Sequence, residues 1–277
     1  MLRIAVAGAM GRMGRAVAVA AAEVPGMTVV AGIVRAGSPA VGSRWDAAPA
    51  ARLVSDPASA LPDIDVLVDF TAPGAVAGLA AACVADGRPL VCGTTGLSGE
   101  ELAALETAAA AIPVFYARNM SLGVHSLVEL LPALALALRG YDVEIIETHH
   151  RHKTDAPSGT ALVLAEAIAT ARGVVLDGHM THGRSGIAPR QPGEIGIHSV
   201  RAGSIPGEHT ILFANEGEEI RIVHRAAGRQ TFALGALDAA RFVANRAPGW
   251  YGMADLARSL ECDGPDGSMS QQEAPGA

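Results

Sequence analysis

The feature that most constrains the fold is the glycine-spaced segment GAMGRMG at residues 8–14, which joins an N-terminal apolar run to a helix-forming run. In a strand–turn–helix of this kind, Gly8 permits a tight turn, Gly11 lets a pyrophosphate approach, and Gly14 permits close packing of helix on strand. The backbone N–H groups that open the helix then face the phosphates. The segment predicts a dinucleotide-binding unit. A purely structural glycine turn is the alternative, because Met10 stands where the usual pattern has its central glycine.

Strand-type and helix-type runs alternate over the first 117 residues. Each strand-type run is short, apolar and bounded by turn residues, which is typical of buried strands. Strands joined by helices in this way form a parallel sheet covered on both faces. The expected strands are 2–8, 27–34, 66–70, 89–93 and 113–117, and the expected helices are 14–24, 74–86 and 98–111.

The pattern changes near residue 120, where strands cluster after a helix. This clustering predicts a second domain of the α+β type with an open sheet. A long loop is expected at 172–192, and the amphipathic helix expected at 231–245 is expected to pack on the first domain. The other expected elements are a helix at 121–138 kinked at Pro132, strands at 141–148, 194–200, 209–215 and 219–225, and a helix at 160–171.

The predicted fold class is therefore α/β, with an N-terminal Rossmann-type parallel sheet and a C-terminal α+β domain with an open mixed sheet. The first domain is expected over 1–120, completed by a helical segment at about 231–260, and the second over 121–230. Residues 263–277 are rich in Gly, Pro, Ser and Gln without apolar periodicity, which predicts a disordered tail.

Composition and charge exclude several classes of protein. The formal net charge is −7, whereas a nucleic-acid-binding domain usually carries a basic excess, so no nucleic-acid partner is expected. No apolar run reaches the roughly 18 residues of a membrane span, and glycines and arginines interrupt the N-terminal run that a signal peptide would need. Three cysteines without a CxxC pair indicate a reducing compartment. We therefore expect a cytoplasmic protein with no membrane partner.

The end of the second expected strand bears on the choice of cofactor. An Asp or Glu at this place binds the adenosine ribose hydroxyls in such folds, but here Val34 lies 20 positions after Gly14 and Arg35 follows it. A guanidinium can pair with a 2′-phosphate. The sequence therefore favours NADPH over NADH, with a solvated surface role for Arg35 as the alternative. The loops VDFTAP at 68–73 and GTTG at 93–96 are expected to leave room for the nicotinamide and its ribose.

Three histidines, an arginine and a lysine lie within five positions at 149–153, although the whole chain is acidic. His149 and Lys153 are four positions apart, so they share a face on a strand and on a helix alike. Histidine titrates near neutrality, and neighbouring cations tend to lower its pKa. A nearby lysine can donate a proton and bind a carboxylate. The pair therefore predicts general acid–base catalysis.

The turn PSGT at 157–160 follows this cluster and opens a helix. Backbone N–H groups of Ser158, Gly159 and Thr160 would form an anion site at the positive end of the helix dipole. Cluster and turn together predict a pocket for a small carboxylate that needs proton transfer. Two alternatives stay open: a solvated basic loop, and a metal site against which the neighbouring cations argue. The possible ligands are His149, His150, His152 and Asp155, and the cations are Arg151 and Lys153.

Five segments together resemble the dihydrodipicolinate reductase family. They are GAMGRMGR, DFTAP, GTTG, EIIETHHRHKTDAPSGTA and VRAGSIPGEHT, and they follow the family's order over about residues 2–260. The resemblance implies reduction of 4-hydroxy-tetrahydrodipicolinate by hydride transfer from NAD(P)H, in the diaminopimelate route to lysine. It also implies a homotetramer joined through the second domain's sheet, with pyridine-2,6-dicarboxylate as an inhibitor mimic. The two domains are expected to close, with hinges near 119–121 and near 226–231.

The resemblance also implies roles for particular residues. His149 is the acid/base residue and Lys153 the proton donor, and the second domain binds the small dicarboxylate substrate and carries the oligomer contacts. The substrate contacts that it implies are His150, Gly159, Thr160 and Arg229. Ser158 is added to them because it lies in the PSGT turn that opens the helix. The cofactor contacts that it implies are Gly8, Ala9, Met10, Gly11, Arg12, Met13, Gly93, Thr94, Thr95, Ala117, Arg118, Asn119 and Met120. Val34 and Arg35 are added to them from their position at the end of the second expected strand.

The sequence departs from the family pattern at two positions. Many members have an acidic residue where Val34 stands, which supports NADH use, and some carry Arg where Ala72 stands. Two other functions stay open. A dehydrogenase of the aspartate dehydrogenase type would explain the nucleotide-binding half but not the segment 149–160, and an NADPH-binding sensor would need no proton donor.

Overall fold

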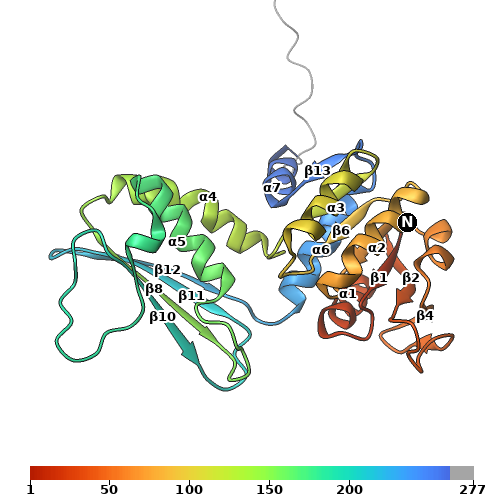
Figure 1. Ribbon diagram of the computed structural model, residues 1–277, viewed down its shortest axis with the longest axis horizontal. Helices are drawn as coiled ribbons and strands as arrows, with labels where there is room; N and C mark the ends of the chain where they lie inside the picture. The colour runs from red at the N-terminus through yellow and green to blue at the C-terminus, as the bar shows by residue number, and fades with distance from the viewer. Residues whose placement is uncertain (263–277) are drawn as a thin grey trace, which may run out of the picture. The chain divides into compact units, whose positions relative to one another are not determined.

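The computed structural model describes residues 1–262, with side chains through residue 260. The chain divides into two compact units, one formed by Met1–Met120 with the described residues from Ala233 onward and the other by Ser121–Phe232. Each unit is a layered structure with a sheet of its own (Figure 1). The tail expected to be disordered at 263–277 lies outside the described residues.

The first unit contains an eight-stranded sheet. Its strands are β1 Leu2–Ala7, β2 Met27–Ile33, β3 Arg44–Trp45, β4 Ala48–Val54, β5 Val66–Asp69, β6 Leu90–Cys92, β7 Pro113–Tyr116 and β13 Gly249–Tyr251. Their order is β13-β7-β6-β5-β1-β2-β4-β3, and every pairing is parallel except that of β3 with β4. Strand β2 pairs with one side of β1, and β5, which comes later in the chain, pairs with the other side. The order therefore reverses beside β1, which is where ligands bind in open α/β sheets.

The helices of this unit are α1 Arg12–Glu23, α2 Pro73–Ala85, α3 Gly99–Ala109, α6 Gln230–Val243 and α7 Met253–Cys262, with short 3-10 helices at Pro57–Ser59 and Leu61–Asp63. Small side chains dominate the core, and Ala5 and Ala7 of β1 are fully buried in it. Local sequence explains the helix starts: Pro73 is the first residue of α2, and Ser98 and Glu101 form a capping box before α3.

The second unit contains a five-stranded mixed sheet in which β8 lies at the centre, parallel to β10 and antiparallel to β11. Its strands are β8 Asp142–His149, β9 Met180–Thr181, β10 Ile195–Arg201, β11 Glu208–Ala214 and β12 Glu219–Arg225, in the order β12-β11-β8-β10-β9. Its helices are α4 Leu122–Ala137, which contains Pro132, and α5 Gly159–Arg172, with a 3-10 helix at Leu176–Gly178. Figure 1 shows both long helices on one face of this sheet.

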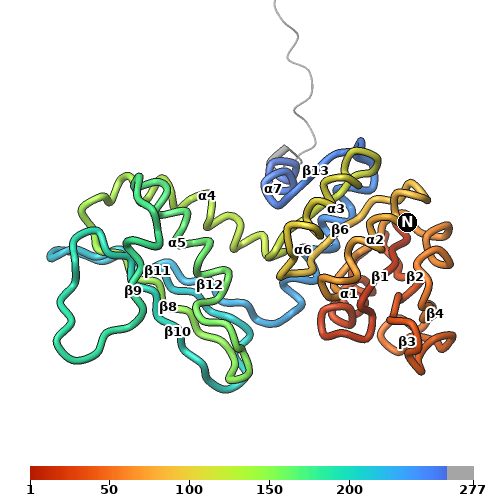
Figure 2. The backbone as a smooth tube through the Cα atoms, viewed as in Figure 1, coloured from red at the N-terminus to blue at the C-terminus, as the bar shows by residue number. Residues whose placement is uncertain are grey.

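Side chains alternate between the two faces of β8, so Val143, Ile145 and Glu147 point to the helix-covered face and are buried. The opposite face leaves apolar side chains exposed, with exposed fractions of 38% for Ile146, 42% for Val200 and 56% for Val223. A wide loop joins β9 to β10 at the edge of the sheet (Figure 2). Arg184 and Arg190 of this loop tie it to the sheet by ion pairs with Glu144.

The fold class predicted from the sequence is confirmed: one sheet is dominated by parallel pairings and the other is mixed. The sequence pattern does not predict β3, β4 or β13, nor β9, which lies within the expected loop at 172–192; α7 falls largely within the helical segment expected at about 231–260. No helix among the described residues is long and apolar enough to cross a membrane.

Candidate active site

The glycine loop between β1 and α1 is shaped by two contacts that exclude side chains. Gly8 has a φ of +76°, and a Cβ on it would lie 2.3 Å from the carbonyl oxygen of Phe70. A Cβ on Gly14 would lie 2.3 Å from the carbonyl oxygen of Gly8, so α1 can approach the strand only with glycine there. Gly11 precedes α1 and has no side chain to cap it. The loop therefore fits a dinucleotide, because the first N–H groups of α1 lack a side-chain partner at the cap.

The end of β2 lies beside this loop, because the N–H groups of Gly8 and Ala9 both donate to the carbonyl oxygen of Ile33. Val34 is buried, and its N–H donates to Val54 in β4. Arg35 is exposed at the start of a turn, where its carbonyl oxygen accepts from the N–H of Ser38. The structure thus places a guanidinium, and no carboxylate, directly after β2.

A buried carboxylate that the sequence reasoning missed lies at the end of β5. Asp69 is 1% exposed and accepts hydrogen bonds from the N–H and hydroxyl of Thr71, the hydroxyl of Thr94 and the thiol of Cys92. Burial raises its pKa, and these hydrogen bonds oppose the rise. Thr94 also accepts from the N–H of Thr71, so its hydroxyl joins the loops after β5 and β6. The available signal was an Asp at the end of a buried strand, in the VDFTAP segment.

The other predicted cofactor residues divide by exposure. A Cβ on Gly93 would lie 2.3 Å from the Phe70 ring, so this glycine makes room for that ring. The chain at Met120 packs against α6 through Gly235, where a Cβ would collide with the carbonyl oxygen of Met120. The exposed members of the predicted set are Met10, Gly11, Arg12, Arg35, Thr95 and Arg118; the partly buried ones are Gly8, Met13 and Asn119; the buried ones are Ala9, Val34, Gly93, Thr94, Ala117 and Met120.

In the second unit, His149 ends β8 and lies on the helix-covered face of the sheet. Its Nδ1 lies 2.6 Å from Oε2 of Glu147, which is fully buried. Arg201 of β10 donates to both oxygens of Glu147, at 2.8 and 2.7 Å, and the N–H of Ser158 donates to Oε1 at 3.1 Å. Burial alone would raise the pKa of Glu147, but hydrogen bonds from Arg201, Ser199 and His149 outweigh it and lower the pKa to about 2.

The surroundings of His149 favour its neutral form. Burial lowers its pKa, Glu147 raises it, and the charges of Lys153 and Arg201 lower it further. The lowering predicted from neighbouring cations thus has burial as its largest cause. On the other side of the ring, a Cβ on Gly207 would lie 3.0 Å from Nε2, so a side chain at this position would press on that edge of the imidazole.

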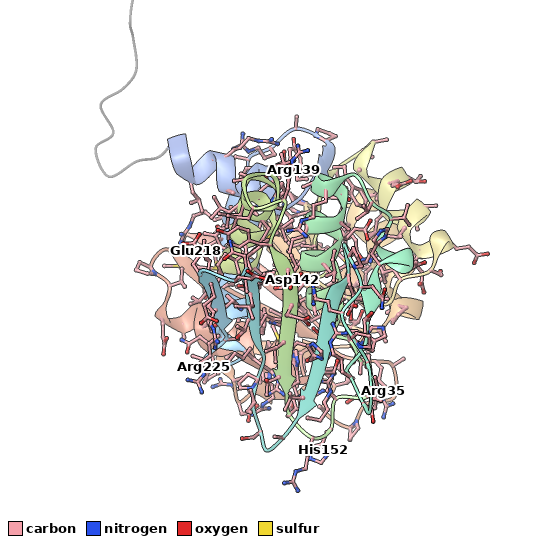
Figure 3. The ribbon with its side chains drawn as sticks, turned by 90° about the vertical axis from the view of Figure 1, so that its left-hand side faces the viewer. Arg35, Arg139, Asp142, His152, Glu218 and Arg225 are labelled. Atoms are coloured by element: carbon pink, nitrogen blue, oxygen red, sulfur yellow. The ribbon has the colours of Figure 1, made fainter. Side chains whose placement is uncertain are left out.

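Lys153 lies in the loop after β8, and it is the only lysine among the 21 Lys and Arg residues of the chain. Its Nζ donates to both carboxylate oxygens of Asp155, at 2.8 and 2.7 Å. The carbonyl oxygen of Asp155 accepts from Arg201 at 2.7 Å. Figure 3 shows Asp142 at one end of β8 and His152, of the same loop as Lys153, beyond the other end.

The start of α5 presents its residues differently from the expectation. Ser158 is buried: its Oγ accepts from the N–H of Ala161 and lies 2.9 Å from Nε2 of His209. Ser158 therefore caps and anchors the helix, whereas Gly159 is exposed and has no atom within 4 Å of a Cβ position. Burial lowers the pKa of His209 to about 4, and the charge of His149 adds to the effect.

Of the remaining predicted residues, Thr160 follows Gly159 in the first turn of α5 and is partly buried. Nδ1 of His150 is buried and has no hydrogen-bond partner among the described residues. Arg229 is exposed in the segment between β12 and α6. Residues 1–260 assemble no group of three metal-ligating side chains.

Comparisons with known proteins cover both units. The family described as dihydrodipicolinate reductase, N-terminus, matches residues 2–120, and the one described as dihydrodipicolinate reductase, C-terminus, matches residues 123–257. Two proteins named 4-hydroxy-tetrahydrodipicolinate reductase, from Rubrobacter xylanophilus and Thiobacillus denitrificans, are each 47% identical to this chain. The alignments cover 94% and 92% of this chain and 99% and 98% of the relatives.

Solved structures show similar architectures. A dipicolinate-bound dihydrodipicolinate reductase from Paenisporosarcina sp. TG-14 has a TM-score of 0.74 at 27% identity, covering 92% of this chain and 99% of that one. A probable dehydrogenase from Thermotoga maritima has a TM-score of 0.60 at 12% identity, covering 94% of this chain and 93% of that one, which is a likeness of fold alone.

Proposed function

The chain belongs to the dihydrodipicolinate reductase family, and from this we propose that it reduces 4-hydroxy-tetrahydrodipicolinate to tetrahydrodipicolinate with NAD(P)H, in the diaminopimelate route to lysine. The observation that carries the proposal is that both family halves match in order and that relatives of this name are 47% identical over almost the whole chain. In the overall reaction the substrate takes up a hydride and a proton and loses its hydroxyl group as water.

We propose that His149 and Lys153 handle the proton. The chain uses arginine at every other cationic position, and a guanidinium cannot give up its proton near neutral pH. An ammonium can, so the single lysine stands where a cation must also be a proton donor. Asp155 holds the ammonium in place. Nε2 of His149 is the ring nitrogen left for proton exchange, because Nδ1 is engaged by Glu147.

The substrate is a small dicarboxylate, and we propose that the start of α5 binds one of its carboxylates. The exposed Gly159 and its neighbour Thr160 lie in the first helical turn, where N–H groups and the helix dipole favour an anion. We propose His150 as a second contact. The Paenisporosarcina reductase was solved with dipicolinate, a dicarboxylate of the same kind. Arg229 stays a proposed contact.

The first unit would hold the nicotinamide cofactor, which supplies the hydride when bound. We propose NADPH as the favoured cofactor and NADH as the weaker one. Arg35 follows β2 where a 2′-phosphate would lie, and Val34 offers no carboxylate for ribose hydroxyls. Gly8, Gly11 and Gly14 give the loop room for the diphosphate, and Asp69 holds the loops after β5 and β6 together.

We further propose a homotetramer joined through the open face of the second sheet, where Ile146, Val200 and Val223 are exposed. We propose a cytoplasmic location, because Cys83 and Cys92 are free thiols. Light scattering of the wild type and of Val223→Glu tests the assembly. The variant should fall apart into smaller species, and an unchanged mass would place the interface elsewhere.

The experiment that tests the reaction follows oxidation of NADPH and NADH by their absorbance. Substrate is made freshly from pyruvate and aspartate semialdehyde by the preceding synthase. We expect rapid oxidation that depends on the synthase, with the higher kcat/KM for NADPH. Absence of oxidation from protein that binds NADPH would refute the reductase assignment and favour a sensor. Oxidation with another keto or imino acid would favour an amino-acid dehydrogenase.

A further inference from the structure

We propose that the buried ion pair of Glu147 and Arg201 is the positioning device of the active site: it keeps the proton of neutral His149 on Nδ1 and so presents Nε2 as the proton-exchanging atom. The proposal rests on the proposed function for the reaction that His149 serves. The contacts of the described residues carry the geometry independently of that reaction.

The hydrogen bonds of Glu147 determine where the proton of His149 lies. An ionised carboxylate can only accept hydrogen bonds. Glu147 is held in this form because Arg201 donates to both of its oxygens and the N–H of Ser158 donates to Oε1. Nδ1 of His149, 2.6 Å from Oε2, must then be a donor. The neutral ring consequently has its lone pair on Nε2, the nitrogen beside Gly207.

Because Glu147 is fully buried, its carboxylate requires the ion pair with Arg201. Glu147 is 0% exposed, so no water competes for its oxygens, and a buried carboxylate without its cation would be costly. The low pKa of Glu147 is consistent with permanent ionisation. The same carboxylate accepts from the N–H of Ser158, the cap of α5. One side chain therefore aligns the histidine with the helix start that is proposed to bind the substrate.

Arg201 also supports the second proton-handling group. Its Nη2 donates to the carbonyl oxygen of Asp155, and the carboxylate of Asp155 holds Nζ of Lys153. The strand register explains this reach, since Arg201 lies opposite His149 in the parallel pairing of β10 with β8. The guanidinium of Arg201 thus contacts both Glu147, which holds His149, and Asp155, which holds Lys153.

Four groups face His149 from the elements around it. They are Glu147 from its own strand, Arg201 from β10, Lys153 from the following loop, and His209 from β11, whose ring centroid is 5.3 Å away. Glu147 favours the protonated imidazole, while Arg201 and Lys153 disfavour it. Removing Glu147 or Arg201 must therefore move the titration of His149 in opposite directions.

This opposition provides the kinetic test. For Glu147→Gln we expect kcat to fall on the order of 100-fold, the size of a general acid–base contribution, and the His149 limb of the pH profile to move to lower pH. For Arg201→Met we expect a comparable loss and a shift of that limb to higher pH. Arg201→Lys should restore part of kcat. Arg258→Met, in an exposed pair with Asp255, is the matched control and should leave both quantities unchanged. Shifts of both variants in one direction would overturn the proposal.

A spectroscopic test on the wild type remains decisive even if a variant fails to fold. Protein labelled with 15N-histidine, with His149 assigned from the spectrum of His149→Asn, reports which ring nitrogen carries the proton. We expect Nδ1–H and a bare Nε2 above the pKa of His149. An Nε2–H tautomer, or a mixture of the two, would overturn the proposal even in an active reductase. An inactive protein with the Nδ1–H tautomer would instead count against the proposed function alone.

Discussion

Glu147 should make the stability of the protein depend on acidity in a way that can be calculated. Its pKa falls from an ordinary value of 4.5 to about 2 in the folded chain, although burial alone would raise it. At about 1.36 kcal/mol per pKa unit, this fall corresponds to about 3 kcal/mol of stability at neutral pH. Because folding lowers the pKa, the contribution is complete above the unfolded value. It is lost as the pH falls through about 4.5 and towards about 2.

The assay compares urea unfolding of the wild type and of Glu147→Gln, which keeps the shape but cannot ionise. The wild type should lose about 2 kcal/mol relative to the variant between neutral pH and about pH 3. Glu219→Gln, in an exposed pair with Arg221, is the control and should show a pH-dependent difference below about 1 kcal/mol. A wild-type advantage over Glu147→Gln that stays constant across this range would refute the reasoning.

Three further substitutions test separate parts of the account. Arg35→Ala should raise KM for NADPH about tenfold, the worth of about 1.4 kcal/mol, with little effect on NADH; equal effects on both cofactors would remove Arg35 from 2′-phosphate recognition. Ser158→Ala should lower the free energy of unfolding by about 1 kcal/mol, because Ala161 loses its cap; unchanged unfolding would contradict the capping role. Gly207→Ala places a methyl group about 3.0 Å from Nε2 of His149, at a backbone φ of +157° that favours glycine, and should lower both kcat and Tm; unaltered turnover would show that this edge is not used.

Local patterns predicted much of the first unit. A Cβ on Gly8 or Gly14 would collide with the backbone. Only glycine fits at these two positions, which is why the glycine spacing predicted the turn. The pattern failed at the edges of the sheet. Strand β4, APAARLV, buries only two of its seven residues and contains a proline, so it lacks the apolar run of a central strand. Strands β3 and β13 have two and three residues, too few to show a period.

The active-site prediction is limited to residues that are close together in sequence and leaves out those that the fold brings in from elsewhere. His149 and Lys153 lie in one short segment, where their residue types and spacing indicate acid–base chemistry. Arg201 is 54 positions from Glu147 and meets it only through the register of β10 on β8. Ser158 was expected to face the substrate, but its contact with His209, 51 positions away, turns it inward. Such pairings depend on strand order, which local sequence does not encode.

The single lysine gives the most direct test of the central claim, that this site donates a proton to a dicarboxylate. Lys153→Arg keeps the positive charge but replaces an ammonium with a guanidinium that does not release its proton near neutral pH. The measurement is kcat of this variant beside its affinity for pyridine-2,6-dicarboxylate. The account predicts a loss of kcat of about 100-fold or more, with the dicarboxylate still bound. Turnover near that of the wild type would show that the site needs only a cation at this position, and would contradict the account.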